Sequence, residues 1–199
     1  MIEDISGIIV DRWLRKEVIA EEDLEIYRYG IIDILQYIFN IVPAIIIGIV
    51  LGQWWEGILF TIVFASLRTY AGGYHATTFG KCFVLSMGIF IIALLVMKYM
   101  NIPDAVCWVL LVASSITIVF LTPVEPINKS VDEVERKVYR KKSIIIWCVE
   151  TIAAVVFMLI EKKAIALCII LAMVAVGGSM VAGKIKLNAY MEEMKKMHG

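Results

Sequence analysis

The sequence predicts an all-α, polytopic membrane protein with about six transmembrane helices and an N-terminal amphipathic helix at the membrane interface. Of its 199 residues, 61% are hydrophobic, well above the roughly 45–50% that is usual for soluble domains. These residues are gathered in long apolar runs, and no polar stretch is long enough to form a second domain. We therefore expect residues 1–199 to form a single membrane-embedded domain.

The N-terminal residues show the pattern of a helix that lies on a membrane surface. Apolar side chains recur there at helical spacing between charged ones, at Ile2, Ile5, Ile9 and Trp13. A secretory signal peptide would instead carry a continuous apolar stretch. We expect an interfacial amphipathic helix within residues 1–23. Docking of a partner peptide on the same face is the alternative.

Six apolar segments follow this helix. A helix needs about 20 mostly apolar residues to cross a hydrocarbon core of ~30 Å. The predicted segments are residues 31–51, 54–67, 83–97, 105–121, 143–160 and 164–182. The second segment is the shortest, so a tilted span and a re-entrant helix are both possible there.

The basic residues are distributed unequally between the two sides of the membrane. With six spans, residues 1–30, 68–82, 122–142 and 183–199 share one side, and they hold 16 of the 19 lysines and arginines. The positive-inside rule then places both termini and the loops 68–82 and 122–142 in the cytoplasm. The 19 basic residues are balanced by 19 acidic ones, which argues against a nucleic-acid partner.

Polar residues within the predicted spans support a rival interpretation. Asp33, Gln36 and Asn40 are spaced to share one helix face, and Glu56 stands near the start of the second segment. Ionisable groups inside a membrane are functional candidates. They are either hydrated at interfacial depth or aligned along a transport pathway, so a small transporter or channel component is one alternative function. A non-catalytic scaffold that docks partners on its amphipathic helices is another.

The glycine-rich loop 68–82 contains His75 and Cys82. The other cysteines, Cys107, Cys148 and Cys168, have apolar neighbours, where a thiol is ordinarily inert. On one uninterrupted helix, His75 and Cys82 would be about 10 Å apart along the axis, too far for the ~3 Å contact of a catalytic pair. We therefore expect a break within residues 77–80, with Thr77 or Thr78 capping the next helix.

In that arrangement Cys82 lies in the first helical turn. The positive end of the helix and Lys81 would stabilise its thiolate, and His75 would act as general base. Metal binding is a weaker interpretation, because one His and one Cys supply only two of the ligands that zinc needs. A purely structural pair is the third possibility. Nothing in the sequence implies a metal or nucleotide cofactor.

At these residues the chain resembles the accessory gene regulator B (AgrB-like) family of bacterial membrane cysteine endopeptidases. Arg68, Gly73, His75 and Cys82 stand where that family carries its Arg, Gly, catalytic His and catalytic Cys. Residues 122–129, Thr-Pro-Val-Glu-Pro-Ile-Asn-Lys, look like the family's proline-bearing motif. With the six-span topology and the chain length, the resemblance extends over nearly the whole chain.

The resemblance implies that the chain processes an AgrD-like quorum-sensing pro-peptide in the bacterial cell membrane. Cys82 would attack the scissile carbonyl and His75 would transfer the proton, which leaves an acyl-enzyme thioester. A cysteine of the bound peptide would then close a thiolactone. Arg68, Gly73 and Lys129 would bind substrate or support the site. The resemblance further implies a homodimer, and it implies no cofactor.

Overall fold

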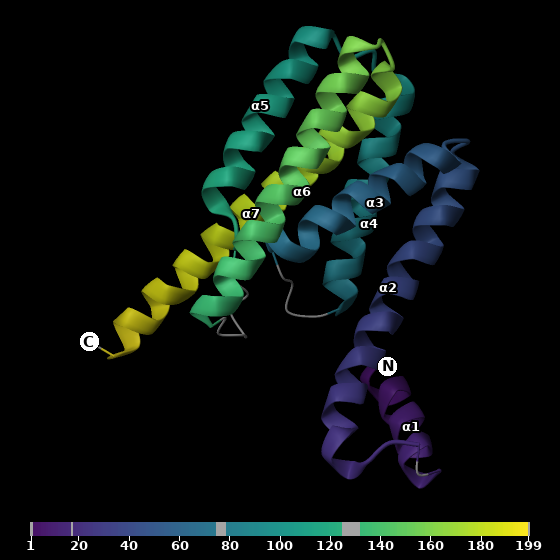
Figure 1. Cartoon of the computed structure of the whole chain (residues 1–199), viewed down its shortest axis with the longest axis vertical. Helices are drawn as coiled ribbons and strands as arrows, with labels where there is room; N and C mark the ends of the chain where they lie inside the picture. Colours follow the sequence, from purple (N-terminus) through teal and green to yellow (C-terminus); the bar gives the residue numbers. More distant parts are fainter. Residues whose placement is uncertain (1, 17, 75–78, 125–131, 199) are drawn as a thin grey trace. The chain divides into compact units, whose positions relative to one another are not determined.

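The computed structural model describes residues 2–16, 18–74, 79–124 and 132–198. These residues are almost entirely helical, and their elements follow in the order α1 (Ile2–Arg15), η1 (Glu21–Asp23), α2 (Leu24–Val50), α3 (Trp54–Ala71), α4 (Phe79–Tyr99), α5 (Asp104–Leu121), α6 (Glu133–Leu159) and α7 (Lys163–His198). The β-structure found in the described ranges is an isolated bridge between Gly72 and Val124. The predicted all-α class is confirmed (Figure 1).

Four of the described helices are long and apolar enough to cross a membrane. The qualifying stretches are Gly80–Tyr99, Asp104–Leu121, Glu133–Leu159 and Lys163–Glu192, and they correspond to the last four predicted segments. The chain is therefore a multi-pass membrane protein. In α2 the described apolar stretch, Ile38–Val50, is shorter. Helix α3 does not qualify, because its mean hydropathy is too low; Glu56 in its first turn and Arg68 in its last both lower that value.

The chain divides into two compact units, one up to Ile46 and the other from Ile47 onward. In the first unit α1 forms a helix within the range predicted for the interfacial segment. Val10 of this helix is buried together with Ile19 and Ile31. The Trp13 ring meets the Tyr27 ring edge-on, with 6.2 Å between the ring centroids. Part of the apolar face of α1 thus packs within the protein.

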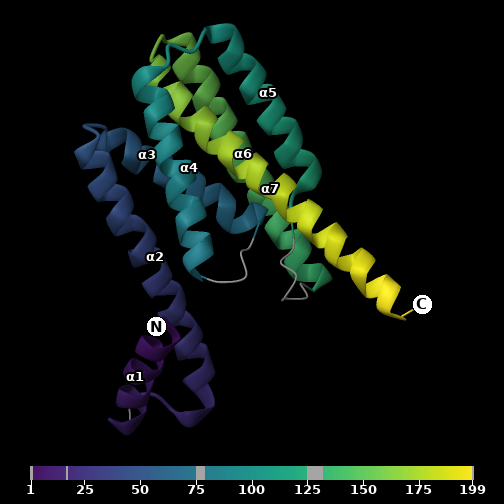
Figure 2. The ribbon, with the colours of Figure 1, turned by 180° about the vertical axis from the view of Figure 1, so that it is seen from behind.

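Helix α7 is the centre of the second unit. It contacts α3, α4, α5 and α6, and Figures 1 and 2 show it among these helices from opposite sides. Of its apolar stretch 56% is buried, against 17–22% for the spans of α4, α5 and α6. Small residues permit this close packing. At Gly177, for example, an added Cβ would lie 3.5 Å from the Thr117 methyl group of α5.

Helix α3 contacts α4, α6 and α7 and runs across the direction of α6 and α7 in both views (Figures 1 and 2). It buries Phe60, whose ring packs edge-on against Phe90 of α4 at 5.7 Å. Leu67 and Ala71, near its C-terminal end, are fully buried. This packing fixes the end of α3 from which the glycine-rich loop leaves.

Helix α6 begins within the stretch that we predicted as the basic loop 122–142. The Asp132 carboxylate accepts a hydrogen bond of 2.7 Å from the Glu133 backbone N–H and caps the helix. Glu133 and Glu135 lie in the first turn, where negative charge is favourable. The basic residues 136–142 therefore belong to the first turns of α6.

Candidate active site

The glycine-rich segment leaves α3 in a conformation that requires glycine. Gly72 has φ 74° and Gly73 has φ 135°, a region that residues with a Cβ rarely adopt. The Gly72 backbone N–H still donates to the Arg68 carbonyl, at 3.2 Å. The Ala71 carbonyl accepts a 2.9 Å hydrogen bond from the Val124 N–H, so the segment lies beside the chain that follows α5.

Helix α7 supports the other side of this segment. The Tyr74 N–H donates to the Ser179 carbonyl at 2.7 Å. A Cβ added at Gly183 would lie 2.6 Å from the Gly73 carbonyl carbon and 2.7 Å from the Tyr74 nitrogen. A Cβ at Gly73 would collide with the Ser179 hydroxyl group. The two chains approach this closely because both positions lack a side chain.

Arg68 holds the same segment from α3. Its Nη2 donates to the Tyr74 carbonyl oxygen, and its Nη1 lies 2.7 Å from the position of a Cβ on Gly73. Burial lowers the pKa of the Arg68 guanidinium from its ordinary value, and the neighbouring Cys82 acts in the opposite direction. Because an arginine stays charged in proteins, the half-buried Arg68 contributes a positive charge that interacts electrostatically with Cys82.

Cys82 lies in the first turn of α4, as predicted, because the helix begins at Phe79. Its side chain is half-buried. The first turn of a helix is a common position for reactive cysteines. The arrangement of Arg68 and Cys82 is therefore suited to nucleophilic chemistry at sulfur.

Several predicted site residues lie outside the described residues. These are His75, the candidate caps Thr77 and Thr78, and Lys129. The structure places Arg68 against Gly73 and Tyr74 and adds Ser179 and Gly183 of α7, which sequence reasoning missed. Their spacing of four within an apolar segment was an available signal, because small residues one helical turn apart mark close contacts in membrane helices.

The remaining cysteines lie in apolar packing. Cys107 and Cys168 are fully buried, and Cys148 is half-buried on α6. The Cys168 thiol donates to the Glu56 carbonyl at 3.4 Å. In the parts of the chain that the structure describes, no group of three His, Cys, Asp or Glu side chains could hold a metal ion.

We expect Cys107→Ala, Cys148→Ala and Cys168→Ala to leave peptide cleavage close to the parent rate. Each change removes a small side chain on α5, α6 or α7, at a cost of about 1 kcal/mol of stability. Cleavage by each purified variant in lipid vesicles, normalised to the amount of inserted protein, measures this. Loss of cleavage in any one variant would assign that thiol a role in the reaction.

The structure describes some of the polar residues on which the transporter interpretation rests. Glu56 lies three turns before Arg68 on α3, and its Oε2 is buried without a hydrogen-bond partner among the described residues. The side chains of Asp33 and Gln36 lie outside the description. Asn40 does have an interaction partner. Glu56 thus lies at the opposite end of α3 from Arg68.

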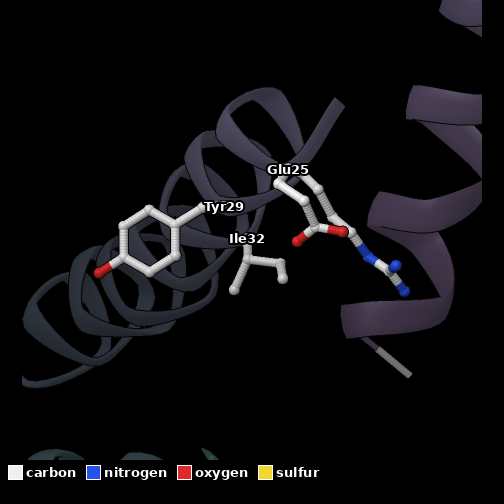
Figure 3. A pocket seen from close by; sticks show the side chains of 4 residues that line it. Glu25, Tyr29 and Ile32 are labelled. Carbon is white, nitrogen blue, oxygen red and sulfur yellow. The ribbon is translucent and has the colours of Figure 1, made fainter. Parts of the chain in front are cut away.

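A pocket in the first unit contains none of the predicted site residues. It is lined by one face of α2, with Glu25, Arg28, Tyr29 and Ile32. Figure 3 shows Tyr29 and Glu25 on either side of Ile32. This spacing of three, four and seven residues is that of a single helix face, so the pocket is a surface feature of α2.

The membrane-spanning helices define a multi-pass helical membrane protein, and Arg68, the glycine-rich segment and Cys82 form its candidate site. Comparison with known proteins identifies the family. The sequence model described as Accessory gene regulator B matches residues 3–181. The chain belongs to the accessory gene regulator B family, whose general role is the processing of autoinducing peptides.

Two similar proteins come from Clostridium perfringens. "Putative AgrB-like protein 2" of strain 13 (type A) is 30% identical over 87 residues, and "Putative AgrB-like protein" of strain SM101 (type A) is 29% identical over 87 residues. Each match covers 44% of this chain and 41% of the relative. The chain thus spans about two fifths of the length of these relatives. No solved structure matches it.

Proposed function

We propose that the chain is a membrane cysteine endopeptidase that cleaves an AgrD-like precursor peptide and prepares its cyclisation to a thiolactone. The observation that carries the proposal is the position of Cys82, half-buried in the first turn of α4 and in electrostatic interaction with half-buried Arg68. Membership of the accessory gene regulator B family supports an autoinducing-peptide precursor as the substrate.

The first half-reaction forms a thioester. The Cys82 sulfur bonds to the scissile carbonyl carbon, and His75 accepts the thiol proton. When the tetrahedral intermediate collapses, the C–N bond breaks and His75 returns that proton to the leaving nitrogen. The C-terminal fragment departs as an amine. The positive charge of Arg68 and the N-terminus of α4 favour the negative charge that develops on sulfur and oxygen.

The second half-reaction closes the ring. The thiol of a cysteine in the bound N-terminal fragment attacks the thioester carbonyl, so the Cys82 thiol is regenerated and a thiolactone forms. No water is consumed in the sum of the two steps. Attack within one bound molecule benefits from a high effective concentration, and a site that excludes water limits competing hydrolysis.

Three further residues have supporting roles in this proposal. Arg68 and Gly73 shape the segment that leads to His75, since Arg68 donates to the Tyr74 carbonyl. Lys129 would contact the precursor's acidic groups by charge attraction. We also propose that both termini face the cytoplasm, from the distribution of basic residues, and that the chain forms a homodimer in the bacterial cell membrane, from the family resemblance.

Trapping of the acyl-enzyme tests the proposal. Purified protein in lipid vesicles is incubated with a synthetic AgrD-like precursor whose ring-forming cysteine is replaced by alanine, so that the thioester cannot cyclise. Intact-protein mass spectrometry should show an added N-terminal fragment less one water, located on Cys82 and released by hydroxylamine. Cleavage of the precursor with no hydroxylamine-labile adduct on Cys82 would contradict the mechanism.

A further inference from the structure

A carboxyl group lies inside the apolar part of α6, where the proposed mechanism makes no use of it. Glu150 is 7% exposed and lies within a helix that qualifies as a membrane span. Among the described residues it has no ion-pair partner, and its Oε2 has no hydrogen-bond partner. A charged carboxylate in such a place is costly unless it is paired or neutralised.

The two contacts of the Ser66 hydroxyl indicate whether the Glu150 carboxyl group carries a proton. The Ser66 Oγ of α3 lies 2.9 Å from the Val63 carbonyl oxygen and 2.9 Å from Glu150 Oε1. A serine hydroxyl carries one proton, whereas a carbonyl and an ionised carboxylate can only accept. Both contacts are hydrogen bonds together when Ser66 donates to Val63 and a protonated Glu150 donates to Ser66.

The location of this contact ties it to the candidate active site. Ser66 comes two residues before Arg68 on α3. Two residues after Arg68, the Tyr70 ring lies 5.0 Å from Lys142 Nζ and 6.2 Å from the Tyr139 ring, both on α6. The contacts of α3 with α6 thus flank Arg68 on either side, and Arg68 in turn holds the Tyr74 carbonyl.

We infer that Glu150 is a neutral carboxylic acid that donates to Ser66 and acts as a positioning residue, holding the Arg68 turn of α3 against α6. The inference rests on the proposed function only where it concerns cleavage. The protonation state of Glu150 and the reactivity of the Cys82 thiol can each be measured without substrate.

Infrared spectroscopy tests the protonation state directly. A difference spectrum between the parent protein and Glu150→Gln, both in lipid vesicles at neutral pH, should contain the C=O stretch of a protonated carboxylic acid. Ser66→Ala should shift this band to higher frequency, because the acid loses its hydrogen-bond acceptor. A difference spectrum that shows carboxylate bands and no acid band would overturn the inference.

Substitutions test the positioning role. Gln keeps an N–H donor at the same place, so Glu150→Gln should cleave near the parent rate, whereas Glu150→Ala should lower kcat/KM about tenfold. The matched control is Thr61→Val on α3, because the Thr61 hydroxyl donates to the Gly57 carbonyl of its own helix at 2.8 Å. Equal loss in Glu150→Gln and Glu150→Ala would contradict a neutral donor.

Alkylation of Cys82 keeps this test separate from the peptidase proposal. In a background with alanine at the other three cysteines, the rate of reaction with iodoacetamide should change severalfold in Glu150→Ala and remain unchanged in Glu150→Gln and Thr61→Val. If the parent protein cleaves no precursor, these rates and the infrared band still decide the inference. An unchanged alkylation rate in Glu150→Ala would refute the positioning role.

Discussion

Replacement of Cys82 by alanine is expected to abolish precursor cleavage, with a fall in rate of at least about a thousandfold. The change removes the sulfur that forms the thioester. Cys107 and Cys168 are fully buried, and Cys148 lies within the membrane-spanning stretch of α6, so none of the three is at the start of a helix beside the glycine-rich segment. Cleavage is followed by mass spectrometry of the precursor in vesicles that contain equal amounts of inserted protein.

Two companion variants show whether the loss is chemical. Cys82→Ser keeps the size of the side chain but replaces a thiol by a far less acidic hydroxyl, so it should be nearly as inactive as Cys82→Ala. His75→Ala should lose cleavage while its Cys82 still reacts with iodoacetamide, because the thiol remains present. Substantial cleavage by Cys82→Ala would refute the cysteine mechanism.

Replacement of Gly183 by alanine is expected to lower cleavage about a hundredfold while the protein still inserts and folds. The added Cβ would lie 2.6 Å from the Gly73 carbonyl carbon, a contact with backbone that no rotamer change relieves. The segment from Gly73 to Tyr74 must then move relative to α7, and displacement of catalytic groups by about 1 Å can reduce a rate by two orders of magnitude. Cleavage kinetics measure the effect.

The matched control lies one turn and a residue away on the same helix. A Cβ added at Gly178 meets nothing within 4 Å, so Gly178→Ala should retain cleavage and gain slightly in helix stability. Thermal unfolding of both variants in detergent separates a local displacement from general misfolding. Parent-level cleavage by Gly183→Ala would show that the contact between α7 and the glycine-rich segment does not support the reaction.

Much of the fold could be predicted because it depends on local properties of the chain. The last four apolar segments are continuous runs with few charges, and each became a qualifying helix. Cys82 was placed in the first turn of its helix from the glycines and threonines before it, since turn residues and caps act over a few positions. These signals depend little on distant parts of the chain.

The remainder depends on contacts between distant segments. Helix α3 contains polar residues whose partners lie elsewhere in the chain: Arg68 donates to the Tyr74 carbonyl, and Ser66 lies against Glu150 of α6. The roles of Ser179 and Gly183 arise from the packing of α7 against a segment more than a hundred residues earlier. Periodicity along one helix carries no information about such partners.

The hydrogen bond from the Tyr74 N–H to the Ser179 carbonyl ties the position of the glycine-rich segment to the position of α7 along its own axis. A helix advances about 1.5 Å per residue, and reacting atoms must approach to about 3–3.5 Å. Sliding of α7 by a single residue would therefore carry the Tyr74 amide through nearly half of that reacting distance. Since α7 also packs against α4, α5 and α6, a change in bilayer thickness or helix tilt that shifts α7 would also move the segment that precedes the proposed catalytic His75.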